Sequence, residues 1–266
     1  MLILTGVVTA LNLVLSLVVG LRLLARARSG GWPAPELSLA IYFLVSAFLG
    51  TPPQVVVYGG MGDPRLAVPD AWARGLLAFA VLAMAIGAAG AYVFTWKTFR
   101  PDRLFAKAIV VAGCGCLAAG YAIEAVFEGF APVMFAGVGH WIGWLGRTMA
   151  TFGVAFESFR YWLLLRRRLR LGLADPVVTN RFLLWSVWAV CSTLNFVADL
   201  GSRALYRLVF GTIQPVPEYL AQTVAPTIAV TMVLGAVSAA TLFLTFFPTP
   251  AYLRWVTSRA ATAQAR

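Results

Sequence analysis

A small set of polar residues lies within otherwise apolar runs of the chain, and these side chains are the ones whose chemistry could serve a function. The set comprises Glu124, His140, Arg147, Glu157, Asn195, Asp199 and Arg203. Asn195, Asp199 and Arg203 follow one another at four-residue steps, which places them on one face of a helix. An ionisable group in hydrocarbon costs at least about 2.5–3.5 kcal/mol, so such groups usually face protein and a partner. We therefore expect a small polar pocket, open toward the outside, between the fourth, fifth, sixth and seventh helices of a membrane bundle.

Other interpretations of these residues stay open. In one, Arg147 and Asp199 form an interhelical salt bridge that only fixes helix packing. In another, Glu157 and Asp199 are carboxylates along the path of a small-solute or ion permease. The leading interpretation is a non-enzymatic, sensor-like protein or accessory subunit, and a membrane enzyme that acts on lipid is a third class. Proton-coupled transport would favour the permease, and turnover of a lipid by the purified protein would favour the enzyme.

The composition is typical of a polytopic α-helical membrane protein. Of 266 residues, 61% are hydrophobic and 12% are charged, whereas a soluble domain carries about 25% charged residues. Several apolar runs exceed the roughly 18 residues that cross a bilayer, and helices satisfy their own backbone groups in lipid. The net charge of +11 fits basic loops held on one side of a membrane, so we expect no nucleic acid as a partner. The excess of Arg over Lys, with many Ala and Gly, indicates a high-GC bacterium and hence a bacterial inner membrane.

The apolar runs predict one bundle of seven transmembrane helices over residues 1–250 and a short basic cytoplasmic tail over 251–266. The expected helices cover about 2–24, 37–58, 71–96, 103–127, 139–171, 176–209 and 218–247. Thr51-Pro52-Pro53 should kink or end the second helix, because proline removes a backbone donor. With seven spans, 16 of the 21 Lys and Arg residues fall on one side and four on the other, with Arg147 inside a helix. The positive-inside rule then places the N-terminus outside and the C-terminus in the cytoplasm.

The connection between the fifth and sixth helices is short and has clear end signals. Gly172 suits the position after a helix, and Asp175-Pro176 suits the N-cap and first position of the next. The two helices should therefore be antiparallel neighbours, and a turn centred near 173–174 puts Arg147 level with Leu200, next to Asp199. On the fourth helix, small residues at four-residue steps predict close helix packing along a stripe that consists of Ala112, Cys116, Gly120 and finally Glu124.

A block of arginines follows the fifth helix and is matched by one more arginine in the sixth. The residues are Arg166, Arg167, Arg168, Arg170 and Arg181. We expect them to anchor the cytoplasmic face on anionic lipid headgroups, at on the order of 1 kcal/mol for each residue near the surface. The alternative is a docking surface for a cytoplasmic or membrane protein partner.

Several kinds of catalytic and cofactor chemistry lack their usual residues in this chain. The seventh helix has no lysine for a retinal Schiff base, although seven helices with an outside N-terminus resemble microbial rhodopsins and G-protein-coupled receptors in topology alone. His140 is the single histidine, which removes bis-histidine haem ligation and the multi-histidine zinc site of the ceramidase-like hydrolases, which the chain resembles in span count. There is no Walker, G-x-S-x-G or HExxH motif. We therefore expect no cofactor, no metal and no catalytic residues.

Overall fold

The computed structural model describes residues 2–60, 68–131, 137–210 and 225–264. All of the regular secondary structure in these residues is helical, which confirms the all-α prediction for them. Six helical segments are long and apolar enough to cross a membrane, namely Gly6–Ser29, Ala34–Val57, Asp70–Phe99, Leu104–Glu128, Pro176–Asp199 and Thr227–Phe246. The described part of the chain is thus consistent with a helical membrane bundle.

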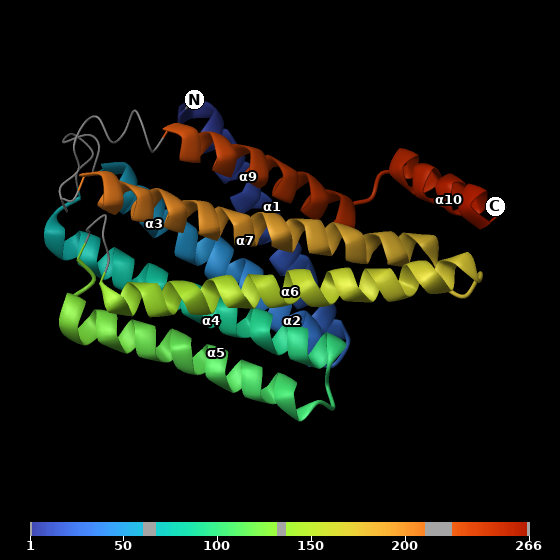
Figure 1. The fold of residues 1–266 in the computed structure, drawn as a ribbon, viewed down its shortest axis with the longest axis horizontal. Helices are drawn as coiled ribbons and strands as arrows, with labels where there is room; N and C mark the ends of the chain where they lie inside the picture. The colour runs from blue at the N-terminus through green and yellow to red at the C-terminus, as the bar shows by residue number, and fades with distance from the viewer. Residues whose placement is uncertain (1, 61–67, 132–136, 211–224, 265–266) are drawn as a thin grey trace.

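The long helices lie side by side along the long axis of the molecule (Figure 1). The N-terminus and the start of α9 lie at one end, the N-terminal end. The turn between α6 and α7 lies at the other, the hairpin end, where α10 also lies. The elements are α1 (Leu2–Ser29), α2 (Ala34–Ile41), η1 (Tyr42–Gly50), α3 (Thr51–Gly60), α4 (Asp70–Phe99), α5 (Leu104–Ile123), η2 (Glu124–Glu128), α6 (Val138–Arg170), α7 (Pro176–Phe210), α9 (Ala225–Phe246) and α10 (Pro250–Gln264).

The helix α6 belongs to the bundle but is not among the six apolar segments. It packs against α4, α5 and α7, and its glycines, tryptophans and ionisable residues lower its mean hydropathy. The polar side chains that it buries include His140, Arg147, Thr148, Thr151 and Ser158. Its other face exposes large apolar side chains, namely Leu145, Met149, Phe152, Phe156, Phe159 and Leu163. Mean hydropathy averages the two faces of the helix, so it does not show that polar and apolar side chains lie on different faces.

The path from α2 to α3 is one helical segment that changes its winding before two prolines. Tyr42–Gly50 has π-helical geometry, and the α-helical pattern resumes at Thr51 and continues to Gly60. Pro52 and Pro53 cannot donate backbone hydrogen bonds, and their rings crowd the carbonyls four residues earlier. The wider π winding accommodates this loss. The predicted disturbance at Thr51–Pro53 therefore takes the form of a widened turn within a continuing helix.

The turn between α6 and α7 has the end signals predicted for it. Gly172 has φ +71°, while Leu173 N donates to Arg168 O at 2.9 Å and Gly172 N donates to Leu169 O at 3.0 Å. This pair of bonds is the Schellman arrangement. Asp175 Oδ1 then accepts from Val177 N at 2.6 Å, which caps α7 in front of Pro176.

The register of α6 against α7 differs from the one predicted from the turn alone. Thr193 Oγ1 donates to Thr151 Oγ1 at 3.1 Å, whereas a symmetric turn would place Thr151 level with Phe196. The offset is three residues at this pair, or roughly 5 Å along a helix. It is six residues where Ser186 Oγ donates to Ala155 O at 3.3 Å, since a symmetric turn would place Ala155 level with Ser192. The residues at both contacts are small. Their fit, and not the turn, sets the register.

The helices α5 and α6 approach closely through glycines. A Cβ placed on Gly120 would lie 2.4 Å from Gly143 N, and one on Gly139 would lie 2.6 Å from Glu124 N. Gly120 and Glu124 therefore face α6, as the small-residue stripe predicts. The first half of that stripe is wrong, because Ala112 and Cys116 are exposed. Gly113 and Leu117 are buried in their place.

The apolar core lies at the centre of the bundle, where η1 meets α7. Phe43 on η1 and Trp188 on α7 have ring centroids 5.3 Å apart, and Val19 and Leu242 are fully buried beside them. This packing holds α1, η1, α7 and α9 together and leaves the polar face of α6 to be covered by α4, α5 and α7.

The predicted tail forms a helix, α10, which the sequence reasoning missed. Asn180 on α7 donates a hydrogen bond to the Tyr252 hydroxyl on α10, and Val256 is buried. Burial raises the pKa of the Tyr252 phenol above its ordinary value, and the bond from Asn180 opposes that rise. Trp255 stays exposed, with the Arg259 guanidinium 4.7 Å from its ring centroid. Such a mixture of apolar and basic residues is typical of a helix at a membrane interface.

Candidate functional site

The helices α5, α6 and α7 carry polar residues toward the N-terminal end of the bundle; those on α5 and α6 are buried, while Asn195 on α7 is half-buried with its Oδ1 enclosed. We call Glu124, His140, Trp144, Arg147 and Asn195 the buried polar cluster. Glu124, His140, Trp144 and Arg147 are 8%, 7%, 5% and 6% exposed. His140, Trp144 and Arg147 follow one another at four- and three-residue steps on α6, so they share its inward face.

The carboxylate of Glu124 lies beside the single histidine of the chain. His140 Nδ1 and Glu124 Oε1 are 3.8 Å apart. At this distance the two side chains form an ion pair when the imidazole is protonated. Two local features position Glu124. It begins the π-helical turn η2, a geometry that often occurs at functional sites, and the close contact of α5 with Gly139 brings its backbone against α6.

The first turn of α6 is fixed by a second carboxylate. Glu128 Oε1 accepts a hydrogen bond from Gly139 N at 2.7 Å. A carboxylate at a helix N-terminus satisfies an otherwise free donor and suits the helix dipole. This contact holds the start of α6, and therefore His140, in place relative to η2.

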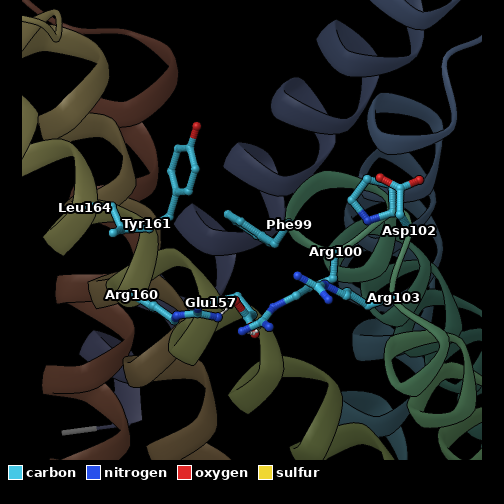
Figure 2. A pocket seen from close by; sticks show the side chains of 9 residues that line it. Phe99, Arg100, Asp102, Arg103, Glu157, Arg160, Tyr161 and Leu164 are labelled. Carbon is cyan, nitrogen blue, oxygen red and sulfur yellow. Dashed lines mark hydrogen bonds and ion pairs between the residues drawn. The ribbon is translucent and has the colours of Figure 1, made fainter.

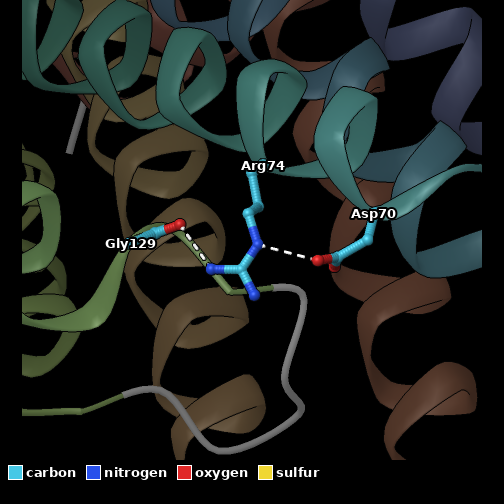
Figure 3. A network of polar contacts seen from close by, with 3 residues as sticks. All are labelled: Asp70, Arg74 and Gly129. Atoms are coloured by element: carbon cyan, nitrogen blue, oxygen red, sulfur yellow. Dashed lines mark hydrogen bonds and ion pairs between the residues drawn. The ribbon is translucent and has the colours of Figure 1, made fainter.

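A network on α4 ties the same region from the other side (Figure 3). Arg74 Nε donates to Asp70 Oδ2 at 3.0 Å, and Arg74 Nη1 donates to Gly129 O at 3.1 Å. Gly129 has φ +61° and ends η2. The arginine therefore links the first turn of α4 to the end of η2.

Three atoms of the buried polar cluster have no hydrogen-bond partner among the described residues. They are His140 Nε2, Trp144 Nε1 and Asn195 Oδ1. The Trp144 ring packs edge-on against Phe196, with centroids 6.3 Å apart, so α6 meets the stretch of α7 that carries Asn195. A buried polar atom without a partner costs about 1–3 kcal/mol, and such an atom in a native protein usually meets a ligand, water or ion.

The other predicted members of this cluster stand as follows. Arg147 Nη1 contacts Met84 Sδ on α4 at 3.1 Å, and its pairing with Asp199 stays a prediction. Asp199 is half-buried on α7, and its carbonyl accepts from Ser202 Oγ at 2.8 Å. The side chain of Arg203 lies outside the described residues.

Glu157 lies apart from the cluster, toward the hairpin end of α6. It is 17 residues from His140, which is about 25 Å along a helix. Arg100 Nε donates to Glu157 Oε1 at 3.0 Å. In the same ion pair Arg100 Nη2 lies 2.9 Å from Oε1, and Arg160 Nη1 lies 3.7 Å from Oε2. Figure 2 shows the carboxylate held between the two guanidinium groups. These residues line a cavity of about 310 Å³ together with Arg103, Asp102 and Tyr161.

The arginine block is exposed at the hairpin end, and its side chains include Arg166, Arg167, Arg168, Arg170 and Arg181. The Arg166 guanidinium lies 5.5 Å from the centroid of the Trp162 ring. This placement leaves the block accessible to lipid headgroups or to another protein, and both of these partners stay predictions.

The sequence reasoning missed Trp144 as a member of the cluster. The polar residues singled out in the sequence did not include Trp144, whose ring is buried against α7. The signal was present in the sequence, because Trp144 stands four residues after His140 and three before Arg147.

Comparison of the chain with protein-family models, with curated proteins and with solved structures found no match. Among the described residues, no group of three or more His, Cys, Asp or Glu side chains could hold a metal ion. The fold of the described residues is consistent with a helical membrane bundle that contains a buried polar cluster.

Proposed function

We propose that the chain is a bacterial inner-membrane protein that crosses the membrane seven times, with its N-terminus outside and its C-terminus in the cytoplasm. The seventh span would be α6. Its lipid-facing side carries Leu145, Phe152 and Phe156, and its polar residues are covered by α4, α5 and α7. The positions of the N-terminus and the start of α9 at one end of the bundle support this path (Figure 1).

The proposed function is non-enzymatic. The protein acts as a sensor-like protein or an accessory subunit, and the buried polar cluster binds a small polar ligand that enters from the outer side. The observation that carries this proposal is the set of three buried atoms without partners, His140 Nε2, Trp144 Nε1 and Asn195 Oδ1. Trp144 Nε1 is a donor and Asn195 Oδ1 is an acceptor, so the ligand must offer both kinds of group. Small zwitterions and polyols have this chemistry.

The permease alternative has less support, because Glu157 already accepts a hydrogen bond from Arg100 and forms an ion pair with it. A carboxylate held in this way, about 25 Å along α6 from His140, does not form a continuous path with the cluster.

Thermal melting of the purified protein in detergent tests the proposal against a panel of glycine, serine, glycine betaine and glycerol. We expect at least one solute to raise the melting temperature saturably. Trp144→Phe keeps an aromatic ring but removes the N–H donor. It should therefore weaken the binding of that solute about 3–10-fold, the equivalent of one hydrogen bond. Trp162→Phe is the matched control, since Trp162 lies on the same helix and its ring contacts Phe159 and Arg166, which are not part of the cluster.

Three results would overturn the proposal. If no solute shifts melting, water alone occupies the cluster. If Trp162→Phe and Trp144→Phe weaken binding equally, the solute binds outside the cluster. If proteoliposomes accumulate the bound solute, the protein is a permease.

A further inference from the structure

A second cavity opens at the hairpin end, between α1, α2, α4, α7 and α9. Its volume is about 360 Å³, near the lower end of the range of small-molecule sites. This cavity is separate from the buried polar cluster, and none of the residues in that cluster lines it.

The rim of the cavity is basic. Arg22, Arg26 and Arg181 line it from α1 and α7, and all three are exposed. Glu36, in the first turn of α2, is the acidic residue of the lining, so the formal charge of these four residues is +2. Glu36 also suits the dipole at its own helix N-terminus.

The arginines of the rim differ in their existing contacts. Arg22 Nη1 donates to Phe246 O at 2.7 Å, and its guanidinium lies 5.1 Å from the Phe247 ring centroid. In the part of the chain that the structure describes, no ion pair or side-chain hydrogen bond is found for the guanidinium groups of Arg26 and Arg181. Arg22 therefore has a packing role, while Arg26 and Arg181 have donors to offer to an anion.

The floor of the cavity is apolar and aromatic. Leu39 is buried, and Phe94, Trp185 and Phe246 pack against the apolar core. Trp185 joins the other two rings, with centroids 6.0 Å from Phe94 and 5.6 Å from Phe246. The cavity therefore passes from a cationic rim to an aromatic floor.

We propose that this cavity binds an anionic amphiphile, with its phosphate or carboxylate on Arg26 and Arg181 and the beginning of its hydrocarbon chain on the aromatic floor. Basic pockets between membrane helices are suited to anionic lipid headgroups. The volume holds a headgroup and the first part of a chain, so the rest of a lipid would extend into the bilayer. This proposal does not depend on the buried polar cluster.

The test uses the full-length protein in detergent and measures binding by native mass spectrometry. Three probes separate the sources of the anion: phosphatidylglycerol has charge and chains, phosphatidylcholine has no net charge, and glycerol 3-phosphate has no chain. We expect one phosphatidylglycerol to bind, and the other two probes to bind at least tenfold more weakly, since each lacks one of the two contacts.

Three variants localise the binding. The double variant Arg26→Gln/Arg181→Gln should weaken the binding of phosphatidylglycerol about 30-fold, because each arginine contributes a little over fivefold. Thr98→Trp places a large ring at an exposed lining position and should abolish binding while leaving all the charges in place. Arg259→Gln removes an exposed arginine of α10 that does not line the cavity, and it should change binding less than twofold.

Several outcomes would overturn the proposal. Equal losses in Arg259→Gln and in the double variant would show diffuse attraction to the basic surface. Unchanged binding to a folded Thr98→Trp protein would show that the lipid does not enter the cavity. Glycerol 3-phosphate binding as tightly as phosphatidylglycerol would show that the aromatic floor has no role. If Thr98→Trp fails to fold, the comparison of the double variant with Arg259→Gln decides.

Discussion

The close contact of α5 with α6 predicts that alanine at position 120 will be destabilising. Its Cβ would lie 2.4 Å from Gly143 N and 2.7 Å from Gly143 Cα. Both are backbone atoms, so no side-chain rotation relieves the clash. Ordinary contact between carbon atoms begins at about 3.5 Å, so the two helices must move apart locally by about 1 Å.

The size of the effect is a balance of two terms. Overpacking of this kind costs about 1–3 kcal/mol, and alanine in place of glycine in a helix gains about 0.8–1 kcal/mol. Gly120→Ala should therefore destabilise the protein by up to about 2 kcal/mol. Gly115→Ala is the matched control on the same helix, because no atom lies within 4 Å of a Cβ placed there. It should be neutral or stabilising by up to about 1 kcal/mol.

Thermal melts of the two variants in the same detergent measure the difference. The overpacking term of about 1–3 kcal/mol separates them, because the gain from alanine is common to both. At roughly 2–4 °C for each kcal/mol in a chain of this size, the melting temperatures should differ by about 2–12 °C. The same helix separation would move Glu124 away from His140. Gly120→Ala should therefore also weaken the binding of any ligand to the buried polar cluster. Equal melting temperatures for Gly120→Ala and Gly115→Ala would refute the packing described here.

Two further predictions concern the ion pair at the hairpin end and the topology. The side chains of Arg100 and Glu157 are 21% and 15% exposed, so the pair is intermediate between a surface and a buried salt bridge. A double-mutant cycle of Arg100→Gln and Glu157→Gln, measured by thermal melts in detergent, should give a coupling free energy of about 2 kcal/mol. Additivity within about 0.5 kcal/mol would show that the pair contributes nothing. Alkaline phosphatase fused after Arg266 should be inactive and the same enzyme fused after Gly62 should be active. The reverse pattern would contradict the proposed orientation.

Local signals in the sequence were sufficient where the structure is determined locally. Gly172 and Asp175 act within a few residues of themselves, and the helix ends they predict are those observed. The stripe from Ala112 to Glu124 was correct only in its second half, for a geometric reason. Residues four apart rotate about 40° around a helix at each step, so Gly120 and Glu124 face α6 while Ala112 has turned away.

Long-range contacts could not be predicted from the sequence, because they depend on how side chains of different helices fit together. The register of Thr151 with Thr193 follows from the fit of small residues. At this pair α7 is displaced by three residues from the level that a symmetric turn predicts. The pairing of Arg100 with Glu157 joins residues 57 apart, and no local pattern indicates it. The cluster on α6 was found from its ionisable members, while Trp144 was not singled out, because aromatic residues near helix ends usually lie at the membrane interface.

The capped turn at residues 171–175 bears on how the chain is inserted during its synthesis. For α6 to cross the membrane, as we propose, His140 and Arg147 must never be left in lipid alone, since an isolated charged helix would be retained in water. The bonds of the turn are all local, between Arg168 and Leu173 and between Asp175 and Val177, so they can form as soon as those residues leave the ribosome. The two helices can then enter the translocon as a preformed hairpin. In this order of events α7 shields part of the polar face of α6 from the start, and acts as its chaperone within the same chain.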